Sequence, residues 1–424
     1  MKQTNLDHEI CYRAVTSRDP RFDGRFFTAV TSTGIYCRPI CPARTPSSRN
    51  CRFYNCAAAA EEAGFRPCRR CRPDTAPGSP IWRGTATTVS RALRLIQEGA
   101  LDQDGVDRLA DRLGVGDRHL RRLFNEHLGA TPVAVAQTRR AHFARQLIDE
   151  TGLPMARIAH SAGFGSVRRF NTVIRRLFGK SPVELRRAAK DALKRVDGEQ
   201  LSLCLPYRPP YDWPTVLRYL EHRAIPGVEQ VVGGMYRRII SCDGEVGIIS
   251  VRPLDKGDAV RLQLPAVCAS SLARLVARTR RLFDLDADPA EIGNQLSRDR
   301  QLARLVRRRP GLRVPGAWDP FELAVRAILG QQVTVRGATT LAGRLVRAFG
   351  ERMFGEGDDT DLGGFGWRFP TPAELATADV GSIGMPAARA RAIRGLAAAI
   401  RDGELQLDTA ADPADVVVQL QSLP

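Results

Sequence analysis

The stretch Gly34-Ile35-Tyr36-Cys37-Arg38-Pro39-Ile40-Cys41 decides the fold of the N-terminal part of this chain, together with Gly64-Phe65-Arg66-Pro67-Cys68-Arg69-Arg70-Cys71. The four cysteines form a C-x3-C pair and a C-x2-C pair with 26 residues between the pairs. Short pairs of this kind let two chain segments close one tetrahedral, all-cysteine zinc site. The spacing therefore predicts one zinc ion with Cys37, Cys41, Cys68 and Cys71 as its ligands.

Arginines crowd the loops around these thiols. They are Arg38, Arg44, Arg66, Arg69, Arg70 and Arg72. A zinc ion with four thiolates carries about two negative charges, and further cations beside it indicate that an anion approaches. Two interpretations stay open on spacing alone. The zinc is purely structural, or one zinc-held thiolate is also a nucleophile, because a metal keeps the thiol deprotonated.

Residues 9–80 resemble the methyl-acceptor domain of the Ada family of bacterial alkylation-response proteins. Besides the two cysteine segments, the match runs through Tyr12-Arg13-Ala14, Arg21-Phe22-Asp23-Gly24, Asn50 and Phe53-Tyr54. The resemblance implies that Cys37 accepts a methyl group from a methylphosphotriester in the DNA backbone while it remains a zinc ligand. It also implies that Thr33, Arg44 and Arg66 touch the DNA backbone. Methylation would remove one negative charge from the cluster and so tighten binding to phosphates.

The length and net charge of the chain indicate its number of domains and its class of partner. A length of 424 residues predicts about three to four domains, and a formal charge of +18 indicates a polyanionic partner, with nucleic acid first. The rival, an anionic membrane surface, is not supported, because no run of 18 apolar residues and no signal-peptide pattern occurs. We expect a cytoplasmic, nucleoid-associated protein.

Six of the ten cysteines lie outside the zinc set, and their scattered positions show no disulfide framework. We expect them to be mostly small packing residues in a reducing compartment. They are Cys11, Cys51, Cys56, Cys204, Cys242 and Cys268.

A repeat of about fifty residues follows the proline-rich linker 72–80. The first copy runs over 106–124 and the second over 155–174, and each has a small alanine, a turn glycine and apolar anchors on the following helix. These are the requirements of a helix-turn-helix, and two in tandem can occupy successive major grooves of DNA.

Residues 89–187 resemble the double helix-turn-helix domain of the AraC family. Recognition helices are expected to begin near Asp117 and Ser166. On each helix the apolar face, Leu120 and Phe124 for example, belongs to the core. The candidates for base and phosphate contacts are Arg118, His119, Arg121, Arg122, Val167, Arg168, Arg169 and Asn171.

After a second linker at 196–200 the pattern becomes strand-like. Alternating apolar residues predict strands near 201–205, 235–240, 246–252 and 259–264, and the Asp243-Gly244 pair predicts a tight turn. We expect an antiparallel sheet with a helix through Leu217 and Leu220 packed on it. An amphipathic helix is predicted at 271–285, and everything after it reads as helical.

From the Pro209-Pro210-Tyr211-Asp212-Trp213 run to its end, the chain resembles the AlkA family of 3-methyladenine DNA glycosylases. Further markers lie at 281–285, 309–316, 321–333 and 384–390. The resemblance implies that the loop Gln331-Gln332-Val333 faces DNA and that Gln332 wedges into the gap left by a flipped base.

The chain departs from that family at Leu423-Pro424, where AlkA-type enzymes enter a glycine-rich helix-hairpin-helix followed by a catalytic aspartate. None of Asp319, Asp408, Asp412 and Asp415 fits that role, so we expect base excision to be very slow or absent. The Pro-Cys-His-Arg sequence of methylguanine acceptor domains is also missing, so no repair of methylated guanine oxygen is expected.

The sequence thus predicts a multidomain α+β protein. The expected domains are a zinc methyl-acceptor domain at 1–80, an all-α double helix-turn-helix domain at 84–190, an antiparallel-sheet α+β domain at 201–288 and an incomplete helical glycosylase domain at 289–424. The main functional hypothesis is a single-turnover methyltransferase and transcription activator that binds double-stranded DNA and works with RNA polymerase. Two alternatives remain: a plain regulator with a structural zinc, and a fragment of a working 3-methyladenine glycosylase.

Overall fold

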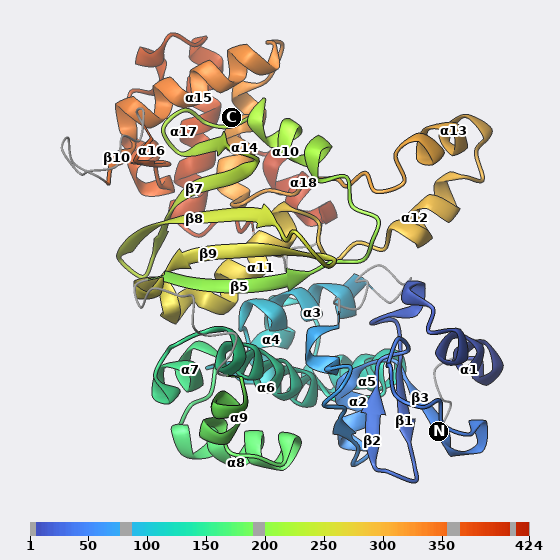
Figure 1. Ribbon diagram of the computed structural model, residues 1–424. Coiled ribbons are helices and arrows are strands. Elements are labelled where there is room, and N and C mark those ends of the chain that lie inside the picture. The colour runs from blue at the N-terminus through green and yellow to red at the C-terminus, as the bar shows by residue number, and fades with distance from the viewer. Residues whose placement is uncertain (1–5, 77–86, 190–199, 354–364, 408–412, 424) are drawn as a thin grey trace.

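The computed structural model describes residues 6–76, 87–189, 200–353, 365–407 and 413–423. The described residues up to 189 form the lower half of Figure 1, and those from 200 onward form the upper half. Residues 77–80 and 196–199 of the two predicted linkers lie outside the described residues, as do Asp408 and Asp412. No helix within the described ranges is both long and apolar enough to cross a membrane.

The N-terminal part folds on a four-stranded sheet with the strand order β3-β1-β2-β4. The pairs β1–β2 and β1–β3 are antiparallel, whereas β2 and β4 are parallel. Phe27, Ala29, Tyr36 and Phe65 form its core with alanines of the second helix. The elements are α1 (His8–Ser17), η1 (Pro20–Phe22), β1 (Phe27–Val30), β2 (Ile35–Cys37), η2 (Ser48–Asn50), β3 (Cys51–Tyr54), α2 (Ala57–Glu62), β4 (Arg66–Pro67) and η3 (Pro73–Thr75).

Within the described residues 87–189 seven helices follow, and they contain both predicted helix-turn-helix units. The first unit is α4–α5 and the second is α7–α8, and the long helix α6 connects them. The helices are α3 (Thr87–Glu98), α4 (Val106–Arg112), α5 (Asp117–Leu128), α6 (Pro132–Glu150), α7 (Met155–Ser161), α8 (Val167–Phe178) and α9 (Pro182–Ala188).

The repeated sequence features have repeated structural roles. The turn glycines Gly114 and Gly163 have φ values of 69° and 89°, the left-handed region that glycine adopts without strain. Each recognition helix ends on a left-handed glycine, and the next helix begins after an N-cap hydroxyl, from Thr131 or Ser181, with proline at its first position. The Gly-x-Thr/Ser-Pro ending of each copy is therefore a helix stop followed by a helix start.

The second half begins with a five-stranded antiparallel sheet of strand order β5-β9-β8-β7-β6. The predicted Asp243-Gly244 turn joins β7 to β8, and both residues have positive φ. The elements are β5 (Gln200–Pro206), α10 (Trp213–Glu221), β6 (Glu229–Val232), β7 (Met235–Cys242), β8 (Glu245–Pro253), β9 (Ala259–Pro265), η4 (Ala266–Ser271) and α11 (Leu272–Leu282).

The remaining residues are mostly helical, as predicted, and residues such as Val325, Leu329, Leu345 and Ile393 are fully buried in their core. The helices α12 and α13 extend away from this core (Figure 1). The elements are α12 (Pro289–Leu296), α13 (Arg300–Arg308), α14 (Pro320–Leu329), α15 (Val335–Phe349), β10 (Glu351–Arg352), β11 (Trp367–Arg368), α16 (Pro372–Thr377), η5 (Val380–Ile383), α17 (Ala387–Arg401) and α18 (Pro413–Gln421).

Two expectations about this half were wrong. The two-stranded pair β10–β11 interrupts the predicted all-helical region. Cys242 and Cys268, expected to be separate packing residues, form a disulfide with their Cα atoms 6.0 Å apart. The end of β7 and η4 meet only through the fold of the sheet, and the spacing of the two cysteines gives no sign of it.

The second helix-turn-helix unit, α6 and the large sheet share one continuous hydrophobic core, whereas the first unit packs in a core of its own with α3. The shared core contains Leu147, Ile158 and Phe170 from the helices and Leu203 and Leu262 from the sheet. The side chains of Gln146 and Glu150 on α6 bond to the main-chain O and N of Cys204 at 2.9 and 2.8 Å, so they pair the open edge of β5.

Candidate metal centre and DNA interface

Parallel pairing of β2 and β4 brings the two cysteine segments together. Tyr36 lies opposite Pro67, so the next residues, Cys37 and Cys68, lie side by side, and the Cys68 N–H donates to the Tyr36 carbonyl at 2.9 Å. A turn after β2 brings back Cys41, whose N–H donates to the carbonyl of Arg38 at 3.1 Å.

The four sulfur atoms fit a zinc ion. They all lie within 4.8 Å of one another, and the Sγ atoms of Cys41 and Cys68 are 4.0 Å apart. Zinc–sulfur bonds of about 2.3 Å in a tetrahedron require sulfur–sulfur distances near ~3.8 Å. The predicted ligands Cys37, Cys41, Cys68 and Cys71 are therefore close to the arrangement that one zinc ion needs.

Two of the arginines around the thiols are internal braces. Arg38 forms a partly buried ion pair with Asp23, with an Nε–Oδ1 distance of 2.8 Å, and also donates to the Cys71 carbonyl and to the Thr75 hydroxyl. Arg72 pairs with both Asp74 and Asp149 at 2.5 Å. These two arginines therefore have partners inside the protein, although Arg38 also lines the groove beside Cys37.

A groove of about 910 Å³ opens beside the cysteines. Cys37 lines it together with Thr33, Arg44, Arg66 and Arg70, and these four neighbours are all exposed. The structure thus brings the predicted backbone-contact residues to the same groove as Cys37. The groove combines cations with an exposed hydroxyl, which suits phosphate groups.

The four sulfurs differ in exposure and in hydrogen bonding. Cys68 and Cys71 are buried, whereas Cys37 and Cys41 are partly exposed. The main-chain N–H of Arg38 donates to the Cys71 sulfur at 3.3 Å.

The recognition helices begin where the sequence predicts, at Asp117 and directly after Ser166. Leu120 and Phe124 are fully buried, and Val167 is half-buried against the core. Arg121 pairs with Asp117 at 3.1 Å. The other DNA-contact candidates are exposed: Arg118, His119, Arg121, Arg122, Arg168, Arg169 and Asn171.

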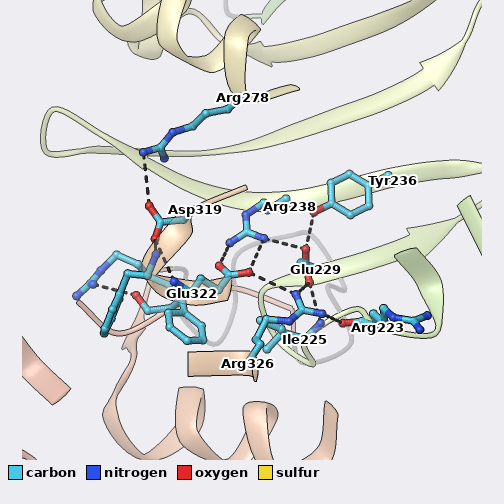
Figure 2. A network of polar contacts seen from close by, with 12 residues as sticks. Arg223, Ile225, Glu229, Tyr236, Arg238, Arg278, Asp319, Glu322 and Arg326 are labelled. Carbon is cyan, nitrogen blue, oxygen red and sulfur yellow. Dashed lines mark hydrogen bonds and ion pairs between the residues drawn. The ribbon is translucent and has the colours of Figure 1, made fainter. Parts of the chain in front are cut away.

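Gln332 lies in an exposed loop between α14 and α15. Its φ of 54° places a non-glycine residue in the left-handed region, which indicates a strained loop tip. Arg326, on the last turn of α14 before this loop, belongs to the ion-pair network drawn in Figure 2.

The network in Figure 2 joins the large sheet to α14, and sequence reasoning missed it. Arg238 on β7 bonds to Glu229 at 2.8 Å and also pairs with Glu322 on α14. Arg326 reaches both carboxylates, and Tyr236 donates to Glu229 at 2.6 Å. Burial opposes ionisation, but the two arginines outweigh it and lower the pKa of Glu229.

A second missed network joins the zinc region to the helix-turn-helix region. The Tyr36 hydroxyl donates to Glu61 at 2.8 Å, and Glu61 also pairs with His142 at 3.1 Å and accepts from Thr138 at 2.6 Å. Burial disfavours both charged forms, but the contact between the two side chains outweighs it. The pKa of His142 is therefore raised and the pKa of Glu61 lowered.

The fold and these sites define a zinc-thiolate protein that binds double-stranded DNA through tandem helix-turn-helix units. Three family models match in order: the metal binding domain of Ada at residues 10–74, a helix-turn-helix domain at 109–188 and the AlkA N-terminal domain at 202–319.

Curated relatives cover the same regions. The probable bifunctional transcriptional activator/DNA repair enzyme AlkA of Mycobacterium tuberculosis is 43% identical over 420 residues, which are 99% of this chain and 83% of the relative. The DNA-3-methyladenine glycosylase 2 of Escherichia coli is 35% identical over 52% of this chain and 74% of its own. The bifunctional transcriptional activator/DNA repair enzyme Ada of Escherichia coli is 38% identical over 34% of this chain and 40% of its own.

The chain belongs to the family of bifunctional transcriptional activator/DNA repair enzymes in which an Ada-type region is fused to an AlkA-type region. It is a DNA-repair protein and regulator, and it holds one zinc ion through its four clustered cysteines.

Proposed function

We propose that Cys37 accepts a methyl group from a methylphosphotriester in the DNA backbone. One observation carries this proposal: Cys37 is a partly exposed sulfur of the cluster that shares a groove with Thr33, Arg44 and Arg66. Zinc, when bound, keeps the four thiols deprotonated at neutral pH.

The chemistry is one displacement. The Cys37 sulfur forms a bond to the methyl carbon, the carbon–oxygen bond of the ester breaks, and its electron pair stays on the phosphate oxygen. The products are a thioether and an ordinary phosphodiester anion. Arg44 and Arg66 bind the charged phosphates that flank the neutral triester, and Thr33 donates to a backbone oxygen. The thioether does not readily give up its methyl group, so each protein molecule reacts once.

The same reaction serves as a switch for DNA binding. Methylation removes one negative charge from the cysteine cluster, which lies in a groove that faces phosphates. We expect the methylated protein to bind duplex DNA several-fold more tightly, with a difference that shrinks as salt rises.

Uptake of labelled methyl groups tests the acceptor role. The protein is incubated with a short duplex that carries tritiated methylphosphotriesters, and bound label and zinc content are measured together. The variant Cys37→Ser should take up none, whereas Cys51→Ser, which changes a buried cysteine outside the cluster, should match the wild type. Because Cys37→Ser can also lose the metal, Arg66→Gln provides a second test: its uptake should be slower and reach the same final level.

We also propose a DNA-facing role for the C-terminal half, with Gln332 as the residue that enters the duplex. The exposed, left-handed position of Gln332 at a loop tip supports it. Incubation with methylated DNA and chromatography of released bases decides whether this chain excises alkylated purines. If bases appear, Gln332→Ala should slow their release, and the variant Gln331→Ala serves as the control.

Two further proposals follow from the family. The first is a division of the chain into a methyl-acceptor domain at 1–80, an operator-binding domain at 84–190, a sheet domain at 201–288 and a glycosylase-type domain at 289–424. In this proposal the protein resides with the chromosome. We propose RNA polymerase as the partner of the methylated protein, since relatives are named transcriptional activators. Transcription from a promoter of the alkylation response should rise only after methylation of Cys37.

A further inference from the structure

The end of the second recognition helix lies against the cysteine cluster. Arg69, which stands between the ligands Cys68 and Cys71, donates from Nη2 to the main-chain carbonyl of Phe178 at 2.9 Å. Phe178 is the last residue of α8, and it lines the same groove as Cys37. One arginine therefore joins the cysteine loop directly to a helix that is expected to read DNA.

A second route from the cluster reaches the same residue. Tyr36, which directly precedes Cys37, bonds through Glu61 to His142 on α6. The His142 ring packs on Phe178 with 6.5 Å between ring centroids, and Arg145 lies over the same ring at 5.4 Å. Chain neighbours of two different zinc ligands thus converge on Phe178.

The charges predict whether methylation strengthens or weakens the contact between Arg69 and Phe178. The C-terminus of a helix carries about half a negative charge, because its last carbonyls have no partner within the helix. The zinc-bound cluster carries about two negative charges as four thiolates and about one after methylation. Arg69 is attracted to both, so loss of charge on the cluster leaves it bound more firmly to the Phe178 carbonyl.

We propose that Arg69 transmits the methylation state of Cys37 to α8 through its bond to Phe178, so that the second helix-turn-helix responds to repair. This inference rests on the proposed methyl transfer. Methylation would then have two effects. It weakens the repulsion between the cluster and DNA, and it also stabilises the last turn of α8 inside the protein.

Hydrogen exchange measured by mass spectrometry tests the inference without DNA. Zinc-loaded protein is compared before and after methylation by a short methylphosphotriester duplex, which is then removed. Amides in the last turn of α8 should exchange more slowly after methylation. A unit charge removed at about 10 Å in an effective dielectric of about 20 is worth on the order of tenfold in a local equilibrium, so we expect a two- to tenfold effect.

Arg70 provides the matched control. It follows Arg69 between the same two ligands, is also exposed and lines the same groove, yet makes no bond to α8 among the described residues. Arg69→Gln should abolish the methylation-dependent difference, Arg70→Gln should keep it, and Arg69→Lys should restore part of it. A merely structural role of Arg69 would change exchange equally in both states.

The two possible failures are distinguishable. If no methyl group reaches Cys37 while zinc is bound, the proposed function is wrong. If methyl transfers normally and the exchange of α8 is unchanged in the wild type, or Arg69→Gln and Arg70→Gln respond alike, only the link through Arg69 is wrong.

Discussion

Cys37 and Arg38 are adjacent in the chain but differ in role: Cys37 is a zinc ligand at the groove, whereas Arg38 braces the site through its pair with Asp23. The sequence predicts all four ligands, because the two short cysteine pairs carry that information in their spacing. It does not predict the role of Arg38, which appears as one of six similar arginines. Asp23, the partner of Arg38, lies 15 positions away, and only the folded chain shows that the two side chains form a partly buried pair. Single-residue environments of this kind cannot be derived from composition.

At this scale, Asp23→Ala should weaken the zinc site. Without the carboxylate, the partly buried Arg38 guanidinium loses its charged partner and keeps only its bonds to the Cys71 carbonyl and the Thr75 hydroxyl, so we expect a cost of about 1–3 kcal/mol. We expect faster loss of zinc to a chelator and a lower melting temperature. Arg21→Gln, which breaks only the exposed pair with Asp19, should have no measurable effect. Equal behaviour of the two variants would show that the Asp23–Arg38 pair does not brace the site.

The Glu61–His142 pair should make the contact between the zinc region and α6 dependent on pH. A raised histidine pKa adds stability that is complete below the unfolded value of about 6.5 and is lost as pH rises through the folded value. Hydrogen exchange in α2 should therefore speed up as pH rises above about 6.5, after correction for intrinsic rates. In His142→Gln this extra rise should be absent, and its presence there would contradict the assignment.

At the scale of elements, the sequence predicts the helices best where caps and turn glycines mark their ends. Both recognition helices begin within a residue of their predicted starts. Sequence reasoning missed β6, because its four residues are too few to show a clear alternation of apolar and polar side chains. The Gly233-Gly234 pair after β6 is a hairpin signal that could have revealed it. Sequence reasoning also missed β10 and β11, whose two residues each are held by tertiary contacts rather than by any pattern of their own.

The two turn glycines occupy equivalent places and should respond differently to substitution. Alanine at either position must adopt positive φ, at a cost of about 1–2 kcal/mol. At Gly163 an added Cβ would also clash with the Asp102 carboxylate, which Arg139 and Arg140 hold in place, whereas at Gly114 it meets nothing. Gly163→Ala should thus lower the melting temperature clearly more than Gly114→Ala. The reverse order would show that Asp102 is free to move.

At the scale of the whole molecule, the high positive charge has two uses. The value of +18 correctly indicates DNA, and exposed arginines lie on the groove and the recognition helices. Other arginines form ion pairs inside the protein. Arg38 braces the zinc region, whereas Arg72 and Arg238 each pair with a carboxylate of another region. The sequence predicts the regions in order but not their shared core, because packing between regions leaves no local signal.

Removal of Arg238 should loosen the contact between the sheet and the helical region. Arg238→Met leaves Glu229 and Glu322 buried with Arg326 as their remaining cation, and we expect a loss of about 3–5 kcal/mol. Limited proteolysis between β9 and α14 should become faster. Arg274→Gln, which breaks an exposed pair with Asp243, is the control and should leave the cleavage rate unchanged.

The central claim is that the sulfur of Cys37 is the methyl acceptor, and peptide mass spectrometry tests it most directly. Zinc-loaded protein is incubated with a duplex that carries methylphosphotriesters and is then digested. The account predicts one added methyl group on the peptide that contains Cys37, with Cys41, Cys68 and Cys71 unmodified. Zinc retained with no methyl on Cys37, or a methyl on one of the other three cysteines, would contradict it.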